Sequence, residues 1–454
     1  MSSFIVEGGF KLNGTVRTSG NKNEALPVIA ASILCNALVH LDNMPNIGDV
    51  KSMLSIAAAL GAIVSEVKNN KVSINAASIK TSTLPLELAS IIRGSILFAS
   101  ALLVRTGKAV IPQPGGDTIG RRRLDTHFLV LKALGASLTI KRNKKAGDKA
   151  AILYVLEAKR GLKGTEVYLD EASVTATENA IIAAAGAKGV TTIGNAASEP
   201  HVQGLCKFLQ AMGVKIEGIG SNVLTIYGRT EFSEAKHSIG SDYIETGSFI
   251  GLAAATKSAL TITNVDIQHM RMILFQFERL GVEVIVDKEK RSIFVPEKQK
   301  MRIQRDMLGA IPKIEDNIWP AFPADLMSIL LVVATQVKGT CLIHEKMFES
   351  RLFFVDKLIG MGAQIVLCDP HRAVVVGPCS LIASSISSPD IRAGMALLIA
   401  ACAARGKSQI QNIGQIDRGY EKIDERLFSL GVHICRSVER RKTGSTISIT
   451  DKKA

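Results

Sequence analysis

The sequence predicts an α/β protein of two domains, with helices inside each domain and sheets outside, the reverse of an ordinary barrel. Two kinds of internal repeat lead to this prediction, and each occurs six times along the chain. Length agrees with it, because 454 residues that are 47% hydrophobic are too many for one compact domain of ordinary size.

The first repeat is the end of a helix followed by the start of a strand. A large apolar residue precedes a glycine, then Ala or Val, then a run of alternating polarity, as in "ALGASLTI" and "RLGVEVIV". Glycine supplies the left-handed cap that ends a helix, and the period then changes from 3.6 to 2 as a strand begins. The spacing is roughly 70 to 80 residues, which suits a small βα subdomain. The glycines are Gly61, Gly135, Gly213, Gly281, Gly362 and Gly431.

The second repeat is a helix that is apolar on nearly all sides. Examples are "NEALPVIAASILC", "TATENAIIAAAGAKG" and "DIRAGMALLIAACAARG". Such helices belong inside a domain. We therefore expect three units in each domain, with a boundary near Ser241: residues 22–240 form the first domain, and 1–21 with 241–454 the second. The strand 4–12 could pair with either domain.

Charged residues stand where these buried helices begin. Asp325 and Asp390 are explained as ordinary N-terminal caps. Lys22, Arg93 and Arg392 are different, because the helix dipole disfavours cations at an N-terminus. They predict a cleft between the domains in which several helix N-termini face a multiply charged anion.

The stretch "PQPGGDTIGRRRLD" (112–125) also fits an anion, since its glycines let the backbone approach a ligand and arginine clamps phosphate or carboxylate. Alone, it is equally well explained as a tight turn between two strands. The chain has no Walker A motif and no full dinucleotide fingerprint, so nucleotide binding through those motifs is not expected.

Composition excludes several other classes. A net charge of +14, with basic runs at 141–149 and 439–444, raises nucleic acid as a partner, but aromatics are only 5% and do not alternate with the basic residues. The seven cysteines form no C-x-x-C pair, which argues against a disulfide framework and a zinc site. No signal peptide or span-length apolar run is present, so we expect a cytoplasmic protein without membrane insertion.

Motifs along the chain resemble those of the enolpyruvyl transferases. They include "SGNKNEALP", "PGGDTIGRRRLDTH", "LDEASVTATEN", "WPAFPADL" and "IDRGYEKIDERL", in the same order from Ser19 to Leu427. The resemblance implies an inside-out α/β barrel of two domains, each with three βαβαββ units. It also implies transfer of the enolpyruvyl group of phosphoenolpyruvate to the 3-hydroxyl of UDP-N-acetylglucosamine, the first committed step of peptidoglycan synthesis, without metal or cofactor. Oligomeric state stays open.

Residue roles follow from the same resemblance. Lys22 and Arg122 are expected to hold the phosphate of phosphoenolpyruvate, Arg392 and Arg418 its carboxylate, and Asp325 to take the proton of the sugar hydroxyl. A carboxylate is a better base there if partial burial raises its pKa. The residues expected to bind the sugar nucleotide are Asn23, Arg93, Asp125, His127, Ser173, Val174, Met347 and Asp390. His127 without its motif would be an incidental surface residue.

Asp117 departs from the family, most members of which have a cysteine that helps to move a proton to the methylene carbon and that fosfomycin alkylates. An aspartic acid can donate that proton if its surroundings favour the protonated form. It cannot form the thioether, so we expect fosfomycin resistance. Tyr243, His201 and Ala324 also depart from the family near the sugar or UDP, which leaves a related acceptor open. A non-catalytic or nucleic-acid-binding descendant is the alternative of another class.

Overall fold

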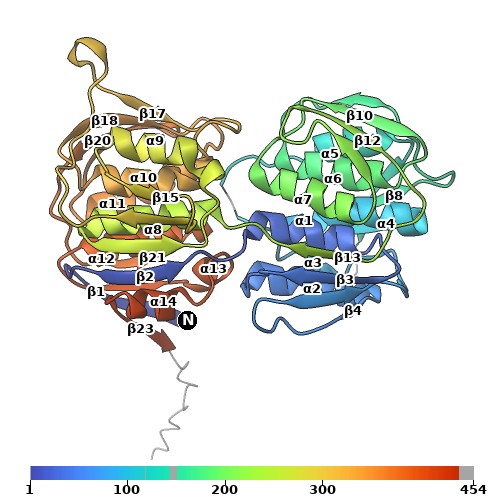
Figure 1. The fold of residues 1–454 in the computed structure, drawn as a ribbon, viewed down its shortest axis with the longest axis horizontal. Helices are drawn as coiled ribbons and strands as arrows, with labels where there is room; N and C mark the ends of the chain where they lie inside the picture. Colours follow the sequence, from blue (N-terminus) through green and yellow to red (C-terminus); the bar gives the residue numbers. More distant parts are fainter. Residues whose placement is uncertain (1, 118, 144–150, 439–454) are drawn as a thin grey trace, which may run out of the picture.

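A computed structural model describes residues 2–117, 119–143 and 151–438. They form two α/β domains side by side (Figure 1). One buried cluster is built from residues 25–239 and the other from residues 4–16 and 243–432. The two-domain α/β class is therefore confirmed. Residues 144–149 of the first basic run, and all of the run at 439–444, lie outside the described residues.

Each domain contains three sheets that share one topology. In each sheet a first strand runs parallel to a second, and two antiparallel strands follow. The strands of the described residues form five sheets of four strands and one of three, in which a bridge between Thr83 and Val110 stands in place of the fourth. These sheets stay separate in the described chain. The expected barrel is therefore an arrangement of sheets around helices and not a closed ring of strands.

The third unit of the first domain follows the βαβαββ order along the chain, whereas the first takes its opening strand, β13, from later in the chain and the second has a bridge at Thr83 in its place. The first has α1 (Lys22–Ser32), β3 (Leu38–Asp42), α2 (Gly48–Leu60), β4 (Ile63–Val64), β5 (Val72–Asn75) and, from later in the chain, β13 (Ala235–Ser238). The second has α3 (Leu86–Ala89), α4 (Phe98–Thr106), β6 (Lys108–Pro112), α5 (Asp125–Ala133), β7 (Ser137–Asn143) and β8 (Ala151–Glu157). The third has β9 (Glu166–Tyr168), α6 (Val174–Ala185), β10 (Val190–Gly194), α7 (Pro200–Ala211), β11 (Lys215–Glu217) and β12 (Val223–Tyr227).

The second domain repeats the pattern. Its first unit has β2 (Asn13–Arg17), α8 (Tyr243–Thr256), β14 (Ala259–Thr263), α9 (Arg271–Arg279), β15 (Ile285–Asp287) and β16 (Ser292–Val295). Its second has β17 (Lys313–Glu315), α10 (Met327–Ala334), β18 (Gly339–His344), α11 (Val355–Gly360), β19 (Gln364–Asp369) and β20 (Arg372–Gly377). Its third has β21 (Ser385–Ser387), α12 (Ile391–Ala403), β22 (Gly406–Gln411), α13 (Gly414–Asp417), α14 (Ile423–Ser429), β23 (His433–Val438) and β1 (Ser2–Gly8).

The chain crosses between the domains twice. The N-terminal strands β1 and β2 both pair in the second domain, which answers where the segment 4–12 belongs. The strand β13 then completes the first sheet of the first domain by pairing with β3. The two crossing segments bind each other, because Asn21 N donates to Gly240 O (2.7 Å) and Asp242 N donates to Ser19 O (3.0 Å). These paired crossings place the N-termini of α1 and α8 beside the interdomain space.

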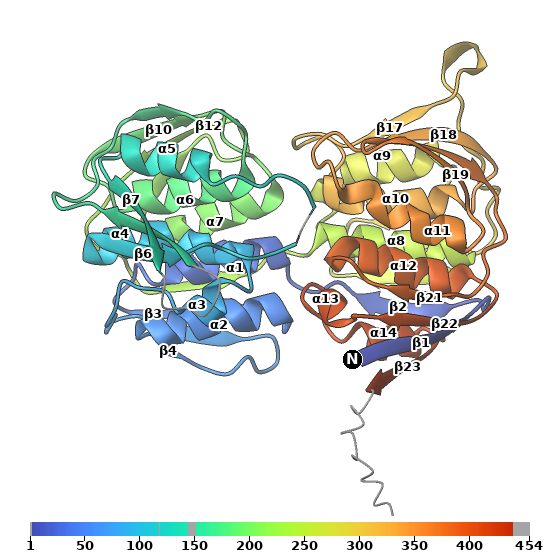
Figure 2. The same cartoon turned by 180° about the vertical axis from the view of Figure 1, so that it is seen from behind.

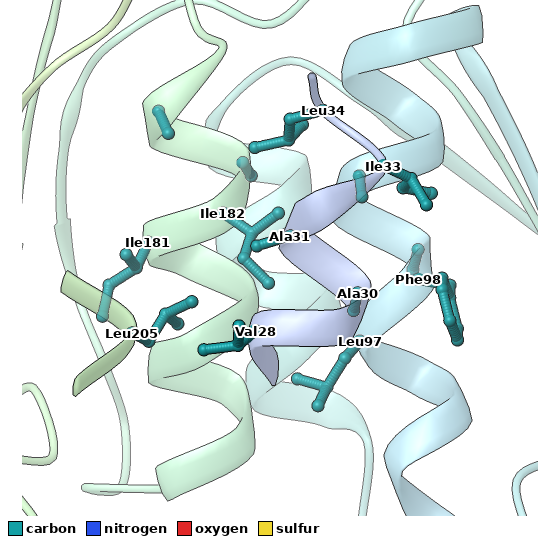
Figure 3. Packing of buried hydrophobic residues seen from close by; sticks show 14 of the residues in the cluster. Val28, Ala30, Ala31, Ile33, Leu34, Leu97, Phe98, Ile181, Ile182 and Leu205 are labelled. Atoms are coloured by element: carbon teal, nitrogen blue, oxygen red, sulfur yellow. The ribbon is translucent and has the colours of Figure 1, made fainter. Parts of the chain in front are cut away.

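Nearly apolar helices form the centre of each domain, as the repeats predict. In α1 every residue except Asn23 is buried, and in α10 all are buried. Figure 3 shows side chains of the first cluster interdigitating, among them Val28, Ile182 and Leu205. The six glycines of the first repeat all have positive φ, from 76° to 112°, which is the left-handed conformation expected where a helix ends.

Among the described residues, the helices are too short or too polar for any of them to span a bilayer.

Candidate active site

A cavity of about 250 Å³ opens between the two domains. The N-termini of α1, α2, α8 and α12 contribute to its lining, and so does the loop 113–124 that follows β6. Lys22, Arg93 and Arg392 all lie in this lining, as the anion-cleft hypothesis expects. The cleft therefore exists where the cations at helix starts indicate it.

Asp49 joins cations from the two domains. It is buried at the start of α2, and its carboxylate pairs with Lys22 Nζ (2.8 Å) and Arg418 Nε (2.8 Å). Burial would raise the pKa of Asp49, but the charges of Lys22 and Arg418 hold it below its usual value. Arg418 also pairs with Asp117, so one guanidinium contacts two carboxylates of the first domain. The pairs connect the domains across the cavity.

Asp325 is held by two arginines of its own domain. Arg392 Nε donates to Asp325 Oδ2 (3.0 Å), and Arg351 Nη2 donates to Oδ1. Burial acts to raise the pKa of Asp325, yet Arg392, Arg351 and Lys22 together bring it well below the usual range. The pKa is thus shifted in the direction opposite to the one expected for an efficient base. The carboxylate is ionised, and its basicity is low while both arginines hold it.

Arg93 and Arg122 supply positive charge with less compensation. Burial and the nearby charge of Arg122 lower the pKa of Arg93 to about 10. Burial also lowers the pKa of Arg122, which makes no ion pair within 4.0 Å among the described residues. The guanidinium groups of Arg93 and Arg122 repel each other, so an anion bound between them is stabilised.

The loop 113–124 begins and ends in the first domain and extends toward the second, which it contacts (Figure 2). Ser350 N donates to Ile119 O (3.3 Å), and Arg121 N donates to Glu349 Oε2 (3.2 Å). Gly120 has φ +128°, a conformation that residues with a side chain rarely adopt, so glycine favours the backbone course that makes this contact. The loop therefore covers the cavity and is not a tight strand-to-strand turn. Thr118 is outside the described residues.

A further group of lining residues is largely uncharged. Burial raises the pKa of Glu178 well above its usual value and also raises that of Glu199. Burial lowers the pKa of His201 to about 4, so this ring is neutral, and raises that of Tyr243. Tyr243 Oη and His201 Nδ1 are 3.3 Å apart and share a hydrogen bond. Charged and uncharged groups thus occupy one cavity but come from different elements.

Ten of the residues expected in the site line this cavity, and four do not. The ten are Lys22, Asn23, Arg93, Asp117, Arg122, Val174, Asp325, Met347, Arg392 and Arg418. Asp125 is exposed and pairs with Arg123. Ser173 is half-buried before α6. Asp390 caps α12 by accepting from Arg392 N (2.8 Å) and Ala393 N (3.0 Å), as the capping explanation predicts.

His127 is a buried residue and not a surface one. It lies on α5, where Asn179 Nδ2 donates to its Nδ1 (2.8 Å), and its Nε2 bonds Thr175 Oγ1 (3.2 Å). Burial lowers its pKa to about 3. The ring therefore connects α5 to α6 behind the cavity lining.

Sequence reasoning missed Asp49, Arg351 and Glu199. Asp49 follows Gly48 at the start of an amphipathic helix, where an acid is an ordinary N-terminal residue. Arg351 lies in the segment "KMFESRL" (346–352), in which only Met347 was assigned a role from the sequence. Their partners are far away in sequence, so no local pattern signals them.

The described residues contain no group of three or more His, Cys, Asp or Glu side chains that could hold a metal ion.

Residues 6–427 match the family described as EPSP synthase (3-phosphoshikimate 1-carboxyvinyltransferase). The chain belongs to the enolpyruvyl transferase family. Relatives named UDP-N-acetylglucosamine 1-carboxyvinyltransferase resemble this enolpyruvyl transferase over nearly its full length. The one from Treponema denticola is 56% identical over 96% of this chain and 99% of its own. The one from Bradyrhizobium diazoefficiens is 52% identical, again over 96% of this chain and 99% of its own.

Solved structures show the same fold for this enolpyruvyl transferase. The enolpyruvyl transferase NikO from Streptomyces tendae has a TM-score of 0.83 at 23% identity, covering 97% of this chain and 99% of its own. An EPSP synthase from Acinetobacter baumannii has a TM-score of 0.73 at 16% identity, covering 96% of this chain and 100% of its own.

Proposed function

We propose that this enolpyruvyl transferase moves the enolpyruvyl group of phosphoenolpyruvate to the 3-hydroxyl of UDP-N-acetylglucosamine and releases phosphate. This reaction is the first committed step of peptidoglycan synthesis, and we place it in the cytoplasm. Support comes from the full-length relatives that bear the name of this activity. These relatives favour UDP-N-acetylglucosamine over shikimate 3-phosphate as the acceptor, since the EPSP synthase structures are only 16% identical to this chain.

The observation that carries the proposal is the excess of cations around Asp325. Six cations line the cavity against five acids, and Glu178 holds its proton, so at least two positive charges are in excess. The cations are Lys22, Arg93, Arg122, Arg351, Arg392 and Arg418, and the acids are Asp49, Asp117, Glu178, Glu199 and Asp325. Such a site favours an anion that carries several charges and a transition state that keeps them.

Substrate anions would take over cations that the protein's own carboxylates now occupy. Lys22 and Arg122 bind the phosphate of phosphoenolpyruvate, and Arg392 and Arg418 bind its carboxylate. Because Arg392 is shared between Asp325 and the substrate carboxylate, its hold on Asp325 weakens and the basicity of Asp325 rises. The donor substrate thereby activates the base for the acceptor.

The chemical steps then balance as addition followed by elimination. Asp325 takes the proton of the 3-hydroxyl while that oxygen bonds to C2 of phosphoenolpyruvate, and Asp117 supplies a proton to the methylene carbon. Asp117 must act as the neutral acid in this step, which requires that the substrate carboxylate draw Arg418 away from it. In the second step Asp117 takes a proton back from the new methyl group while the C–O bond to phosphate breaks, and Asp325 gives its proton to the leaving phosphate, which leaves the enol ether and free phosphate.

Phosphate release from phosphoenolpyruvate tests the proposal. Release should require UDP-N-acetylglucosamine, and Asp325→Asn should lower it by about 10³-fold or more, because the base is lost. Asp266→Asn, at a partly exposed ion pair with Arg291 outside the cavity lining, is the matched control and should keep full activity. Release with shikimate 3-phosphate and not with the UDP sugar would contradict the acceptor, and no release with either would contradict the function.

A further inference from the structure

Two acids in the cavity lining have no part in the steps above. Glu178 lies on α6 with 1% of its surface exposed, and its Oε1 has no hydrogen-bond partner among the described residues. Glu199 immediately precedes α7, and its Oε2 also lacks a partner there. A buried polar atom left unpaired is costly, so it usually marks a place that a ligand or water completes.

The surroundings of these acids disfavour charge. Burial raises the pKa of both, and the nearby Glu199 carboxyl raises that of Glu178 further, because two ionised carboxylates would repel each other. Their neighbours in the lining, His201 and Tyr243, are neutral as well. A carboxylic acid that keeps its proton offers one donor and one acceptor, which suits an uncharged hydroxyl or amide group. A phosphate would instead be drawn to the arginines.

The uncharged groups extend toward the base. Tyr243 begins α8 and hydrogen-bonds His201, and its pKa is raised by burial and by the nearby carboxyl groups of Glu199 and Asp325. Trp319 packs on Tyr243 with ring centroids 5.7 Å apart and also lines the cavity. A sugar whose hydroxyl reaches Asp325 therefore has its neighbouring ring substituents in reach of this wall.

We propose that Glu178 and Glu199 form a neutral polar wall that binds the uncharged substituents beside the reacting hydroxyl of the acceptor sugar, here the 2-acetamido group and the 4-hydroxyl. This rests on the proposed function, because it names the part of that acceptor which the wall recognises. The wall sets specificity for the sugar ring, while the arginines bind the charged parts of both substrates. Glu178 and Glu199 act in recognition and not in proton transfer.

Binding of UDP-N-acetylglucosamine and of UDP, each measured by titration calorimetry, tests the proposal. UDP lacks the sugar ring, so its Kd should not depend on Glu178 or Glu199. Glu178→Leu should raise the Kd of UDP-N-acetylglucosamine about 10-fold, the loss of one buried hydrogen bond, and leave that of UDP unchanged. Glu178→Gln keeps a donor and an acceptor without charge, so it should bind both ligands as the wild type does.

Thr191→Val is the matched control, because Thr191 Oγ1 is also buried, has no hydrogen-bond partner within the described part of the chain, and lies outside the cavity lining. It should change neither Kd. Thermal unfolding shows that each variant is folded. An unchanged Kd of UDP-N-acetylglucosamine in folded Glu178→Leu, or an equal rise in the Kd of UDP, would overturn the proposed wall. Glu178→Gln binding UDP-N-acetylglucosamine as weakly as Glu178→Leu does would overturn the proposal that the wall is neutral. If the wild type neither binds nor turns over the UDP sugar, the proposed function itself fails.

Discussion

Replacing Asp49 with asparagine should destabilise the protein without changing the shape of the side chain. Asp49 is 2% exposed and neutralises Lys22 and Arg418 at 2.8 Å each. Removing one partner of a buried ion pair costs about 3–5 kcal/mol. The Lys22 and Arg418 side chains keep 10% and 17% of their surface exposed to the cavity, so we expect roughly 2–3 kcal/mol here. That corresponds to a Tm lower by roughly 4–12 °C for a domain of this size.

Anions should reverse part of that loss. Phosphate or phosphoenolpyruvate placed between Lys22 and Arg418 replaces the missing charge, so either should raise the Tm of Asp49→Asn more than that of the wild type. Scanning fluorimetry with and without phosphate measures both effects. Asp369→Asn is the control, since Asp369 pairs with Arg372 at the surface and its replacement should leave the Tm nearly unchanged. Equal Tm losses in the two variants, or no additional gain from phosphate, would refute the reasoning.

Three further predictions concern reactivity and pH. Fosfomycin should leave the wild type active but inactivate Asp117→Cys over time, because none of the seven cysteines lines the cavity; time-dependent inactivation of the wild type would contradict this. Arg351→Met removes one cation from Asp325, so its pKa should rise and the acid limb of kcat/KM should move about 1–2 pH units higher; an unmoved limb would exclude Arg351 as a partner of the base. His127 has a pKa of about 3 when folded, below its unfolded value, so it stabilises the fold fully above about pH 6.5 and progressively less as pH falls. The urea midpoint of unfolding should therefore fall more steeply between pH 7 and pH 5 for the wild type than for His127→Gln. Parallel midpoint curves for the two proteins would contradict this role of neutral His127.

The inner helices and their ends could be predicted from the sequence because their signals are local. Apolarity on all sides requires burial wherever the helix lies, and Gly61 or Gly431 reports a left-handed cap from its neighbours alone. Lys22, Arg93 and Arg392 could be grouped because a cation at a helix N-terminus needs an explanation beyond the helix.

The remaining features depend on contacts between distant segments. Pairing of β13 with β3 joins residues almost 200 positions apart, and no local pattern distinguishes it from pairing with the adjacent unit. Asp49 looks like a helix-capping acid until Arg418 of the other domain is beside it. The direction of the Asp325 pKa was open for the same reason, because burial and two arginines oppose each other and only geometry decides which effect is larger.

Analysis of the product of phosphoenolpyruvate and UDP-N-acetylglucosamine, by mass spectrometry and proton NMR, tests the central claim most directly. The account predicts a UDP sugar heavier by one enolpyruvyl group, with vinyl protons of an enol ether on the oxygen at C3, formed by the wild type and absent with Asp325→Asn. An unmodified UDP sugar after incubation with active, folded protein, or an enol ether at another position of the ring, would contradict it.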